Sequence, residues 1–268
     1  MADVAARDWR LIREESRDGP TNMALDEVAA KSATEDGVRT IRVYRWEPSC
    51  LSLGYGQAPE SVDWDFCERE GIDVTRRQTG GGGIYHDSHA DISYSIVAPA
   101  EELPGDLMEC YELLCDPILD AFANMGVDAA FADDEYPSIH QPACYLRDIH
   151  PAHDVLAGGQ KISGNAQYRQ RDAVIQHGSL SFDLATANHC GVFAGEPDRD
   201  TFEDRVTSIH AQSGIDREAA VGALEDTLQD WADADEGAWT EDELAAAADL
   251  AESKYRSDTW NRERADPT

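Results

Sequence analysis

The residues best suited to chemistry lie in one stretch, residues 76–87, which reads RRQTGGGGIYHD. Arg76 and Arg77 stand at the end of a predicted strand, beside the glycine run 80–83. Glycine lets main-chain N–H groups approach a ligand closely, and successive N–H groups in such a loop form a concave anion site. The two guanidinium groups could add bidentate contacts to a carboxylate or phosphate. The stretch predicts an anion site, with a mobile hairpin tip as the alternative.

Other candidates are single side chains in glycine-rich or irregular segments. Lys161 follows a Gly-Gly turn in a chain with only three lysines, and its ammonium suits a phosphate or a polarised acyl oxygen. Cys144 lies in an irregular segment, where a thiol near a cation could act as a nucleophile. His86 and His177 lie beside Gly- or Ser-rich stretches. The alternatives are an exposed turn lysine, an incidental cysteine and structural histidines.

The composition limits the class of partner. The 268 residues carry a formal net charge of −32, spread along the chain. This charge argues against a nucleic-acid binder, because phosphate contacts need clustered Lys and Arg, and it disfavours anionic membranes. A lysine-poor acidic surface is typical of salt adaptation, since salt at 1 M shortens the screening length to about 3 Å. We expect a cytoplasmic protein from an organism with a high-salt interior.

Neither the cysteines nor the apolar segments suggest a metal site or a membrane. The six cysteines show no C-x-x-C pair and no metal-ligand spacing, so most are expected to be small buried side chains. Residues 1–4 lack the start of a signal peptide, and no apolar run reaches the roughly eighteen residues of a membrane span. We expect a soluble protein without a metal.

The elements that must position these residues follow from periodicity and capping. Strands are predicted at residues 9–12, 41–46, 50–56, 71–75, 92–97, 174–183 and, as a hairpin turning at Gly158-Gly159, 154–167. Helices are predicted from Thr21 or Asn22 to about Lys31, from Val62 to Glu70 with Gly71 as C-cap, from 107 to 125 with Pro117 inside, and at 218–232 and 241–255. Residues 133–151 are expected to be irregular. The irregular alternation predicts an α+β fold with a mixed sheet.

Together, several segments resemble the motifs of the lipoate–protein ligase and octanoyltransferase family. Residues 76–87 resemble its RRxTGGGxxxHD signature, and residues 161–167 (KISGNAQ) its K-[IV]-[SA]-G-x-A-Q segment. Residues 177–180 (HGSL) resemble its HG-[ST]-L strand, and residues 22–27 and 254–261 its end motifs. The resemblance spans nearly the whole chain, with the motifs in the right order.

The resemblance implies a biotin-protein-ligase-like catalytic domain, a mixed sheet flanked by helices. We expect residues 1–195 to form its core and residues 196–268 a helical C-terminal part of the same domain. The implied reaction attaches an octanoyl or lipoyl group to one lysine of a lipoyl domain, in a 2-oxoacid dehydrogenase E2 subunit or the glycine-cleavage carrier protein. The implied donors are an octanoyl-acyl carrier or free lipoate, and some short ligases need a separate accessory subunit.

Two mechanisms divide the family. The cysteine-dependent octanoyltransferases take octanoate onto a thiolate, and Cys144 lies where they keep it, in a setting completed by Pro151 and Asp154. The ligases activate lipoate with ATP and magnesium, and Lys161 with the glycine loop would then clamp the adenylate. We favour the Cys144 acyl-enzyme, with no tightly bound cofactor. The ligase is the first alternative, and a non-catalytic acyl- or lipoyl-domain-binding paralogue is the second.

The resemblance also assigns site residues. Its catalytic candidates are Cys144 and Lys161. The residues expected to bind the acyl group or adenylate are Arg76, Arg77, Thr79, Gly80, Gly81, Gly82, Gly83, Tyr85, His86, Asp154, Gly164, Asn165 and His177. The aliphatic tail needs an apolar slot, and its candidate wall residues are Tyr44, Leu53, Tyr85 and Ile162.

Overall fold

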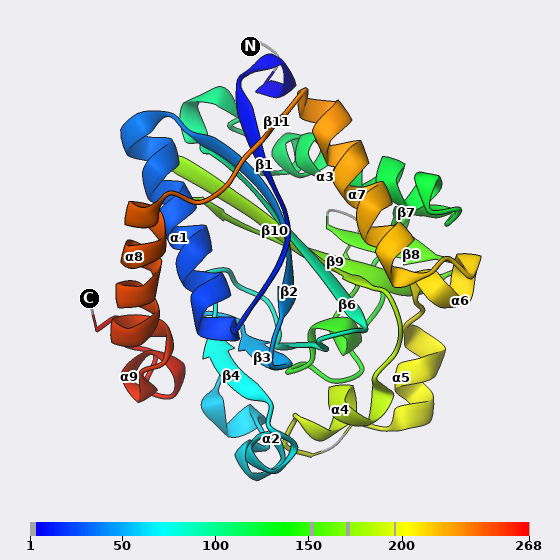
Figure 1. The fold of residues 1–268 in the computed structure, drawn as a ribbon. Coiled ribbons are helices and arrows are strands. Elements are labelled where there is room, and N and C mark those ends of the chain that lie inside the picture. The colour runs from blue at the N-terminus through cyan, green and yellow to red at the C-terminus, as the bar shows by residue number, and fades with distance from the viewer. Residues whose placement is uncertain (1–3, 151–152, 170–171, 196, 268) are drawn as a thin grey trace.

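The chain folds around one large sheet and one small sheet. The computed structural model describes residues 4–150, 153–169, 172–195 and 197–267 (Figure 1). Within these residues the large sheet has eight strands, in the order β11-β1-β2-β6-β10-β9-β8-β7. In the same order, their bounds are Asp235–Glu236, Trp9–Arg17, Arg39–Trp46, Asp91–Pro99, Ala173–Ser181, Gln160–Arg169, Asp154–Ala157 and Ala129–Phe131.

The large sheet is mixed, as predicted. β1 runs parallel to both of its neighbours, β2 and β11. The remaining neighbours, from β2 across to β7, are antiparallel. The expected α+β class is therefore confirmed. Strands β5 and β7, of three residues each, and β11, of two, were not predicted, because segments this short carry no readable periodicity.

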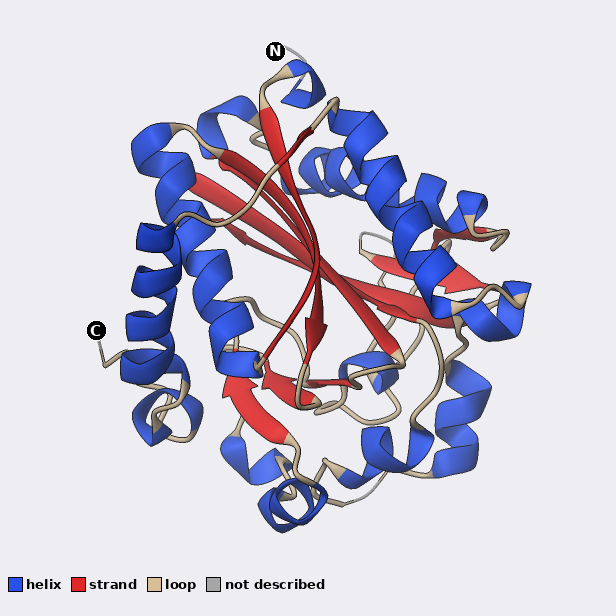
Figure 2. Cartoon of the chain, viewed as in Figure 1, coloured by secondary structure: helices blue, strands red, loops and turns tan. Residues whose placement is uncertain are grey.

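The small sheet and the helices enclose the large sheet. The small sheet has the order β4-β3-β5, with bounds Asp73–Arg76, Cys50–Leu53 and Ile84–His86. The longer helices are α1 (Gly19–Asp36), α3 (Leu107–Asn124), α7 (Arg217–Ala232) and α8 (Glu241–Leu250), the last continued by a π-helical turn, Ala251–Tyr255. The shorter helices are α2 (Trp64–Glu70), α4 (Thr186–Gly191), α5 (Arg199–Arg205), α6 (Ile209–Ser213) and α9 (Asp258–Asn261). Figure 2 shows the helices on both sides of the sheet.

Alternation along the strands divides the core between the two faces of the large sheet. Val43 belongs to the cluster under α3 and α7, and the next residue, Tyr44, to the cluster under α1 and α8. Successive side chains of a strand point to opposite faces, so both faces need a cover. α7 contacts α3, and α8 contacts α1, so the C-terminal helices help to bury both faces of this one sheet.

The start of α1 differs from the prediction. Asp18 is the N-cap, accepting a hydrogen bond from the Thr21 backbone N–H, and the helix continues to Asp36. Thr21 and Asn22 are therefore not caps. Asn22 is fully buried, and its Nδ2 donates to the backbone oxygens of Arg17 and Arg45. Buried polar groups need such partners, so Asn22 ties the helix to two strands.

The remaining elements follow the sequence closely. Gly71 is the C-cap of α2 in a left-handed conformation, and Pro117 lies inside α3 without splitting it. Residues 133–150 are irregular apart from a short 3₁₀ turn, Cys144–Leu146. Pro151, expected beside this segment, lies outside the described residues. No helix in the described part of the chain is both long enough and apolar enough to cross a bilayer.

A buried histidine makes the stability of this fold sensitive to pH. His189 in α4 stacks on Phe202 at 4.9 Å between ring centroids and meets the edges of Tyr85 and Tyr145. Burial lowers its pKa to about 4. Between pH 6.5 and 4 the unfolded chain therefore binds a proton that the folded chain does not, so stability falls as the pH falls.

We predict that His189→Phe flattens this loss. Each pH unit across the window costs the wild type up to about 1.4 kcal/mol from this one group. Urea unfolding of both proteins between pH 7 and 4.5, at constant high salt, measures the difference. Equal losses in the two proteins would contradict the assignment.

Candidate active site

A cavity of about 340 Å³ lies between the two sheets, within the usual range for small-molecule sites. Side chains from β2, β9 and β10 form one wall, and side chains from β3 and β5 form the other. One end is open, because Asp148 and His150, which line it, are exposed. The other end is closed by buried side chains, among them Tyr44 and Trp46.

Cys144 lies at the open end of this cavity. It is the only one of the six cysteines, all of them within the described residues, that is not buried. Its Sγ lies 4.0 Å from Lys161 Nζ. A Cβ built on Gly164 would lie 3.4 Å from the same sulfur, so the glycine keeps the space beside Cys144 open. A thiol, an ammonium and free space for an acyl group therefore meet at one point.

Lys161 is held beside the sulfur by a buried ion pair. Its Nζ lies 2.7 Å from Asp154 Oδ1 and donates to the backbone oxygen of Cys144 at 3.0 Å. The two strands of the β8–β9 hairpin bring Lys161 and Asp154 together, and its turn needs Gly158 and Gly159 because both have positive φ. The predicted hairpin is confirmed.

The electrostatics keep both partners of this pair charged. Burial alone would lower the pKa of Lys161, but Cys144 and Asp154 outweigh it and raise that pKa. Burial would likewise raise the pKa of Asp154, but Lys161 and His153 together outweigh it and hold the carboxyl pKa below its usual value. The site thus keeps a fixed ammonium where negative charge would develop on sulfur or on an acyl oxygen.

Arg77 shapes the glycine loop from inside. It is almost fully buried, and its Nη2 donates to the backbone oxygens of Gly80 and Gly82 at 2.8 and 2.7 Å. Its Nη1 donates to the backbone oxygen of Ser52 at 2.8 Å. Arg77 lines the cavity, so a contact between it and a bound substrate remains a prediction. The hydrogen bonds show that it also fixes the loop that lines the cavity.

The prediction for Arg76 is wrong. This side chain is fully buried and does not line the cavity. Its Nη1 donates to the backbone oxygens of Gly54, Tyr55 and Gln57, and its Nε and Nη2 donate to those of Trp260 and Asn261. A fully buried guanidinium that is bonded to five backbone oxygens and lies outside the cavity lining cannot reach a substrate anion in the cavity. Arg76 instead joins the small sheet to the C-terminal residues.

The four glycines have different positions. Gly80, Gly81 and Gly82 line the cavity, and Gly81 has a φ of 94°. A Cβ on Gly82 would lie 2.9 Å from the Cys144 backbone nitrogen, so only glycine lets the loop approach that segment closely. Gly83 does not line the cavity. Its N–H donates to Pro142 O, and its oxygen accepts from the Cys144 N–H, so it anchors the Cys144 segment instead of binding substrate.

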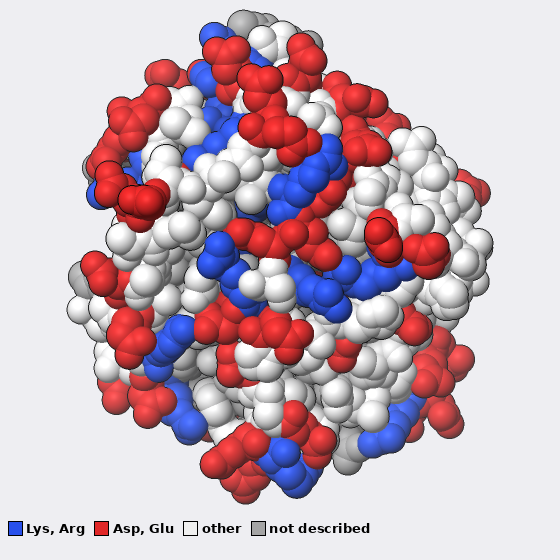
Figure 3. Space-filling model, viewed as in Figure 1, with Lys and Arg blue, Asp and Glu red and all other residues white. Residues whose placement is uncertain are grey.

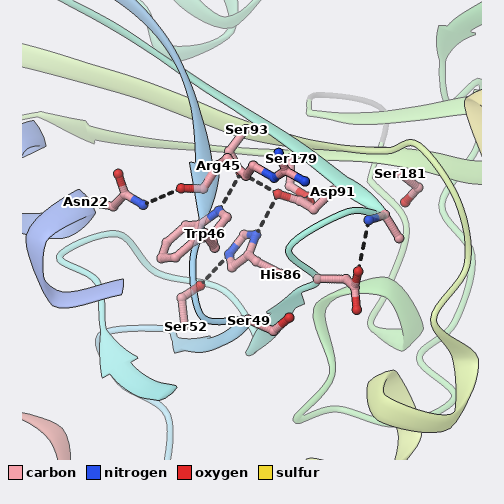
Figure 4. A network of polar contacts seen from close by, with 12 residues as sticks. Asn22, Arg45, Trp46, Ser49, Ser52, His86, Asp91, Ser93, Ser179 and Ser181 are labelled. Atoms are coloured by element: carbon pink, nitrogen blue, oxygen red, sulfur yellow. Dashed lines mark hydrogen bonds and ion pairs between the residues drawn. The ribbon is translucent and has the colours of Figure 1, made fainter. Parts of the chain in front are cut away.

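A buried polar network forms the closed end (Figure 4). His86 Nε2 lies 2.9 Å from Ser52 Oγ, and His86 Nδ1 lies 3.2 Å from Asp91 Oδ2. The Trp46 ring stacks on His86 at 4.0 Å, and its Nε1 donates to Ser93 Oγ. Burial lowers the pKa of His86, which favours the neutral ring. The network holds the Trp46 ring in place as part of the cavity wall.

The other predicted polar residues divide between wall and support. His177 and Asn165 line the cavity, as does Asp154. Asn165 Oδ1 accepts from Tyr94 OH at 2.7 Å, which fixes its amide. Thr79 is buried outside the cavity lining and contacts His177 Nε2 at 2.8 Å, so it supports a wall residue and does not reach substrate.

Only one of the predicted tail-contacting residues lies in the wall. Tyr44 lines the cavity, whereas Leu53, Tyr85 and Ile162 are buried but are not among its lining residues. Tyr85 OH donates instead to Asp87 Oδ2 and accepts from Asn188. The sequence analysis missed several wall residues: Met23, Trp46, Ser52, Arg147, His150, His153 and Ser179. Met23 and Ser179 lie within quoted motifs that were not assigned to the wall, and only their positions in the fold distinguish the others.

The fold is that of a lipoate-ligase catalytic domain. A crystal structure of lipoate-protein ligase A bound with ATP matches with a TM-score of 0.80 at 24% identity, covering 95% of this chain and 98% of that one. An archaeal bi-partite lipoate protein ligase from Thermoplasma acidophilum, studied with its E2 lipoyl domain, matches with a TM-score of 0.77 at 23% identity, covering 95% and 96%. The expected fold is confirmed.

The sequence comparisons define the family more narrowly. The model of the lipoyl protein ligase A/B catalytic domain matches residues 18–230. Octanoyltransferase LipM of Staphylococcus aureus is 30% identical, with 94% of this chain and 97% of the relative covered. Octanoyltransferase LipM of Bacillus subtilis is 30% identical, with 96% and 98% covered. The chain belongs to the lipoyl protein ligase A/B catalytic-domain family, as the motifs indicated.

The buried ion pair predicts a strong asymmetry between single and double variants. Asp154→Asn leaves the Lys161 ammonium buried without a countercharge, which should cost about 3 kcal/mol or more of unfolding free energy. The double variant Asp154→Leu/Lys161→Met removes both charges and should recover most of that loss. Urea unfolding in molar salt measures both values. A single variant as stable as the wild type would contradict the paired geometry.

Proposed function

We propose that this chain is an octanoyltransferase that carries the acyl group on Cys144 and delivers it to the acceptor lysine of a lipoyl domain. The observation that carries the proposal is the cysteine itself. It is the one accessible thiol, it opens into the acyl-sized cavity, and an ammonium lies 4.0 Å from its sulfur. The relatives named octanoyltransferase LipM, aligned over nearly their whole length, support the same reaction.

In the first step the Cys144 sulfur attacks the thioester carbon of an octanoyl-carrier protein. A carbon–sulfur bond to Cys144 forms, the bond to the carrier sulfur breaks, and the carrier thiol leaves with the proton that Cys144 gave up. Lys161 stabilises the negative charge first on the sulfur and then on the acyl oxygen. The tail lies along Tyr44 toward Trp46.

In the second step the acceptor lysine attacks the Cys144 thioester. A carbon–nitrogen bond forms, the Cys144 thiolate leaves beside Lys161, and the nitrogen gives up a proton. The acyl group arrives already activated as a thioester, so this route uses neither ATP nor magnesium. We propose the lipoyl domain of a 2-oxoacid dehydrogenase E2 subunit or the glycine-cleavage carrier protein as the acceptor.

The decisive comparison is between two acyl donors, octanoyl-carrier protein without ATP and lipoate with ATP. We expect the protein to modify a lipoyl domain with octanoyl-carrier protein without ATP, and Cys144→Ala to lose at least about 10³-fold in rate because the covalent route is removed. Mass spectrometry of the lipoyl domain gives both rates.

Two outcomes would contradict the proposal. Undiminished transfer by Cys144→Ala, together with lipoate-dependent ATP–pyrophosphate exchange, would identify the ligase reaction, with Lys161 and the glycine loop around an adenylate. Failure to modify any lipoyl domain with either donor would identify a non-catalytic binding protein.

We further propose a cytoplasmic protein adapted to high salt. Figure 3 shows acidic side chains scattered over the visible face with basic side chains, Lys or Arg, between them. Several arginines form ion pairs, such as Arg10 with Glu243 and Arg217 with Glu14. The excess of carboxylates repels itself, and salt shortens the range of that repulsion from about 10 Å at 0.1 M to about 3 Å at 1 M.

We predict that the unfolding temperature rises when potassium chloride is raised from about 0.1 M to about 1 M. Thermal unfolding followed by circular dichroism measures it. An equal or lower unfolding temperature in the higher salt would contradict the adaptation.

A further inference from the structure

A histidine at the open end of the cavity has no role in the reaction described so far. His153 lines the cavity that contains Cys144. About a third of its side chain is exposed, yet its Nδ1 is buried and has no hydrogen-bond partner. The exposed part of the ring is therefore the edge away from Nδ1. The ring thus presents one buried nitrogen to the protein and its other edge to the entrance.

Asp154 lies behind the buried nitrogen. Its Oδ2 is 3.5 Å from His153 Nδ1, while its Oδ1 is 2.7 Å from Lys161 Nζ. The chain of groups therefore runs from His153 through Asp154 and Lys161 to Cys144. Asp154 makes no hydrogen bond to Nδ1 at this distance, but its negative charge favours a proton on that nitrogen and stabilises the ring when the other nitrogen takes up a second proton.

The second step of transfer needs such a proton acceptor. An acceptor lysine arrives as an ammonium at neutral pH, and it must lose a proton before its nitrogen can attack and another during attack. Lys161 cannot accept either proton, because it is already an ammonium bound to Asp154 and to the Cys144 backbone oxygen. Its raised pKa agrees with this.

We propose that His153 is the general base that takes the proton from the acceptor lysine. This inference rests on the proposed acyl transfer and adds a catalytic residue to it. The lysine ammonium first loses one proton to water and enters the site as a neutral amine. Its nitrogen then bonds to the acyl carbon, the bond to the Cys144 sulfur breaks with the electron pair left on the thiolate, and the second proton passes from nitrogen to His153 Nε2. The negative charge of Asp154 stabilises the protonated His153 ring. The exposed edge of that ring then releases the proton to water.

Several polar groups surround His153 and would tune this step. His150 stacks on it at 5.3 Å between ring centroids, and Tyr111 from α3 lies at 5.7 Å. Asn165 Nδ2 donates to its backbone oxygen at 3.0 Å, and Glu135 lies 3.6 Å from His150 Nε2. These contacts hold the backbone and ring of His153 in place. Among the described residues, Asp154 is the one carboxylate within ion-pair distance of the His153 ring.

The test separates attack by lysine from attack by an amine that needs no base. Wild type and His153→Asn are first acylated on Cys144, and the thioester is then given either a lipoyl domain or hydroxylamine, which is neutral at pH 7. We expect the variant to transfer to lysine about 10²-fold more slowly or worse. We expect hydroxylamine to cleave both thioesters at similar rates.

The controls decide between a base and a structural role. His89→Asn, an exposed histidine outside the cavity lining, should keep the wild-type lysine rate. Equal slowing of both amines in His153→Asn, or lysine transfer at the wild-type rate, would overturn the inference. If the wild type forms no thioester, the proposed function fails instead. In that case the rates of transfer to the lipoyl domain by wild type and His153→Asn are compared with lipoate and ATP as the donor. Lysine attack on the adenylate needs the same base.

Discussion

The buried ion pair between Lys161 and Asp154 is the interaction on which the site depends. An ammonium at this depth is stable only with a countercharge, and the β8–β9 hairpin supplies Asp154 at 2.7 Å. The same ammonium holds the Cys144 backbone oxygen, so the ion pair also fixes the segment that carries the thiol. Positive charge beside the sulfur therefore comes from the fold itself and is present before any substrate binds.

The second constraint is the close approach of two loops. Gly82 and Gly83 lie against residues 142–144 with backbone hydrogen bonds in both directions, and a side chain on Gly82 would prevent this. Arg77 donates hydrogen bonds to the backbone oxygens of Gly80 and Gly82 in the same loop. Arg76, the last residue of β4, ties the end of that strand to the backbone oxygen of Trp260. The arginines, which suggested anion ligands, thus form the scaffold of a rigid cavity wall.

Motifs and periodicity were enough to predict the family, the mixed sheet, the hairpin at Gly158 and the meeting of Cys144 with Lys161. They failed where the partner of a side chain is distant in sequence. Arg76 bonds to the backbone of Trp260 and Asn261, and Trp46 stacks on His86 across two sheets. His153 is ordinary in sequence, because only the fold places it in the wall of the cavity that contains Cys144. Such long-range packing leaves no periodic or motif signal to read.

The intact mass of the protein after incubation with octanoyl-carrier protein in high salt is the most direct test of the Cys144 thioester. We expect one added octanoyl group that hydroxylamine removes and that Cys144→Ala never acquires. A wild type that stays unmodified while it transfers octanoate to a lipoyl domain would contradict a covalent intermediate. An adduct that persists in Cys144→Ala would contradict the choice of nucleophile.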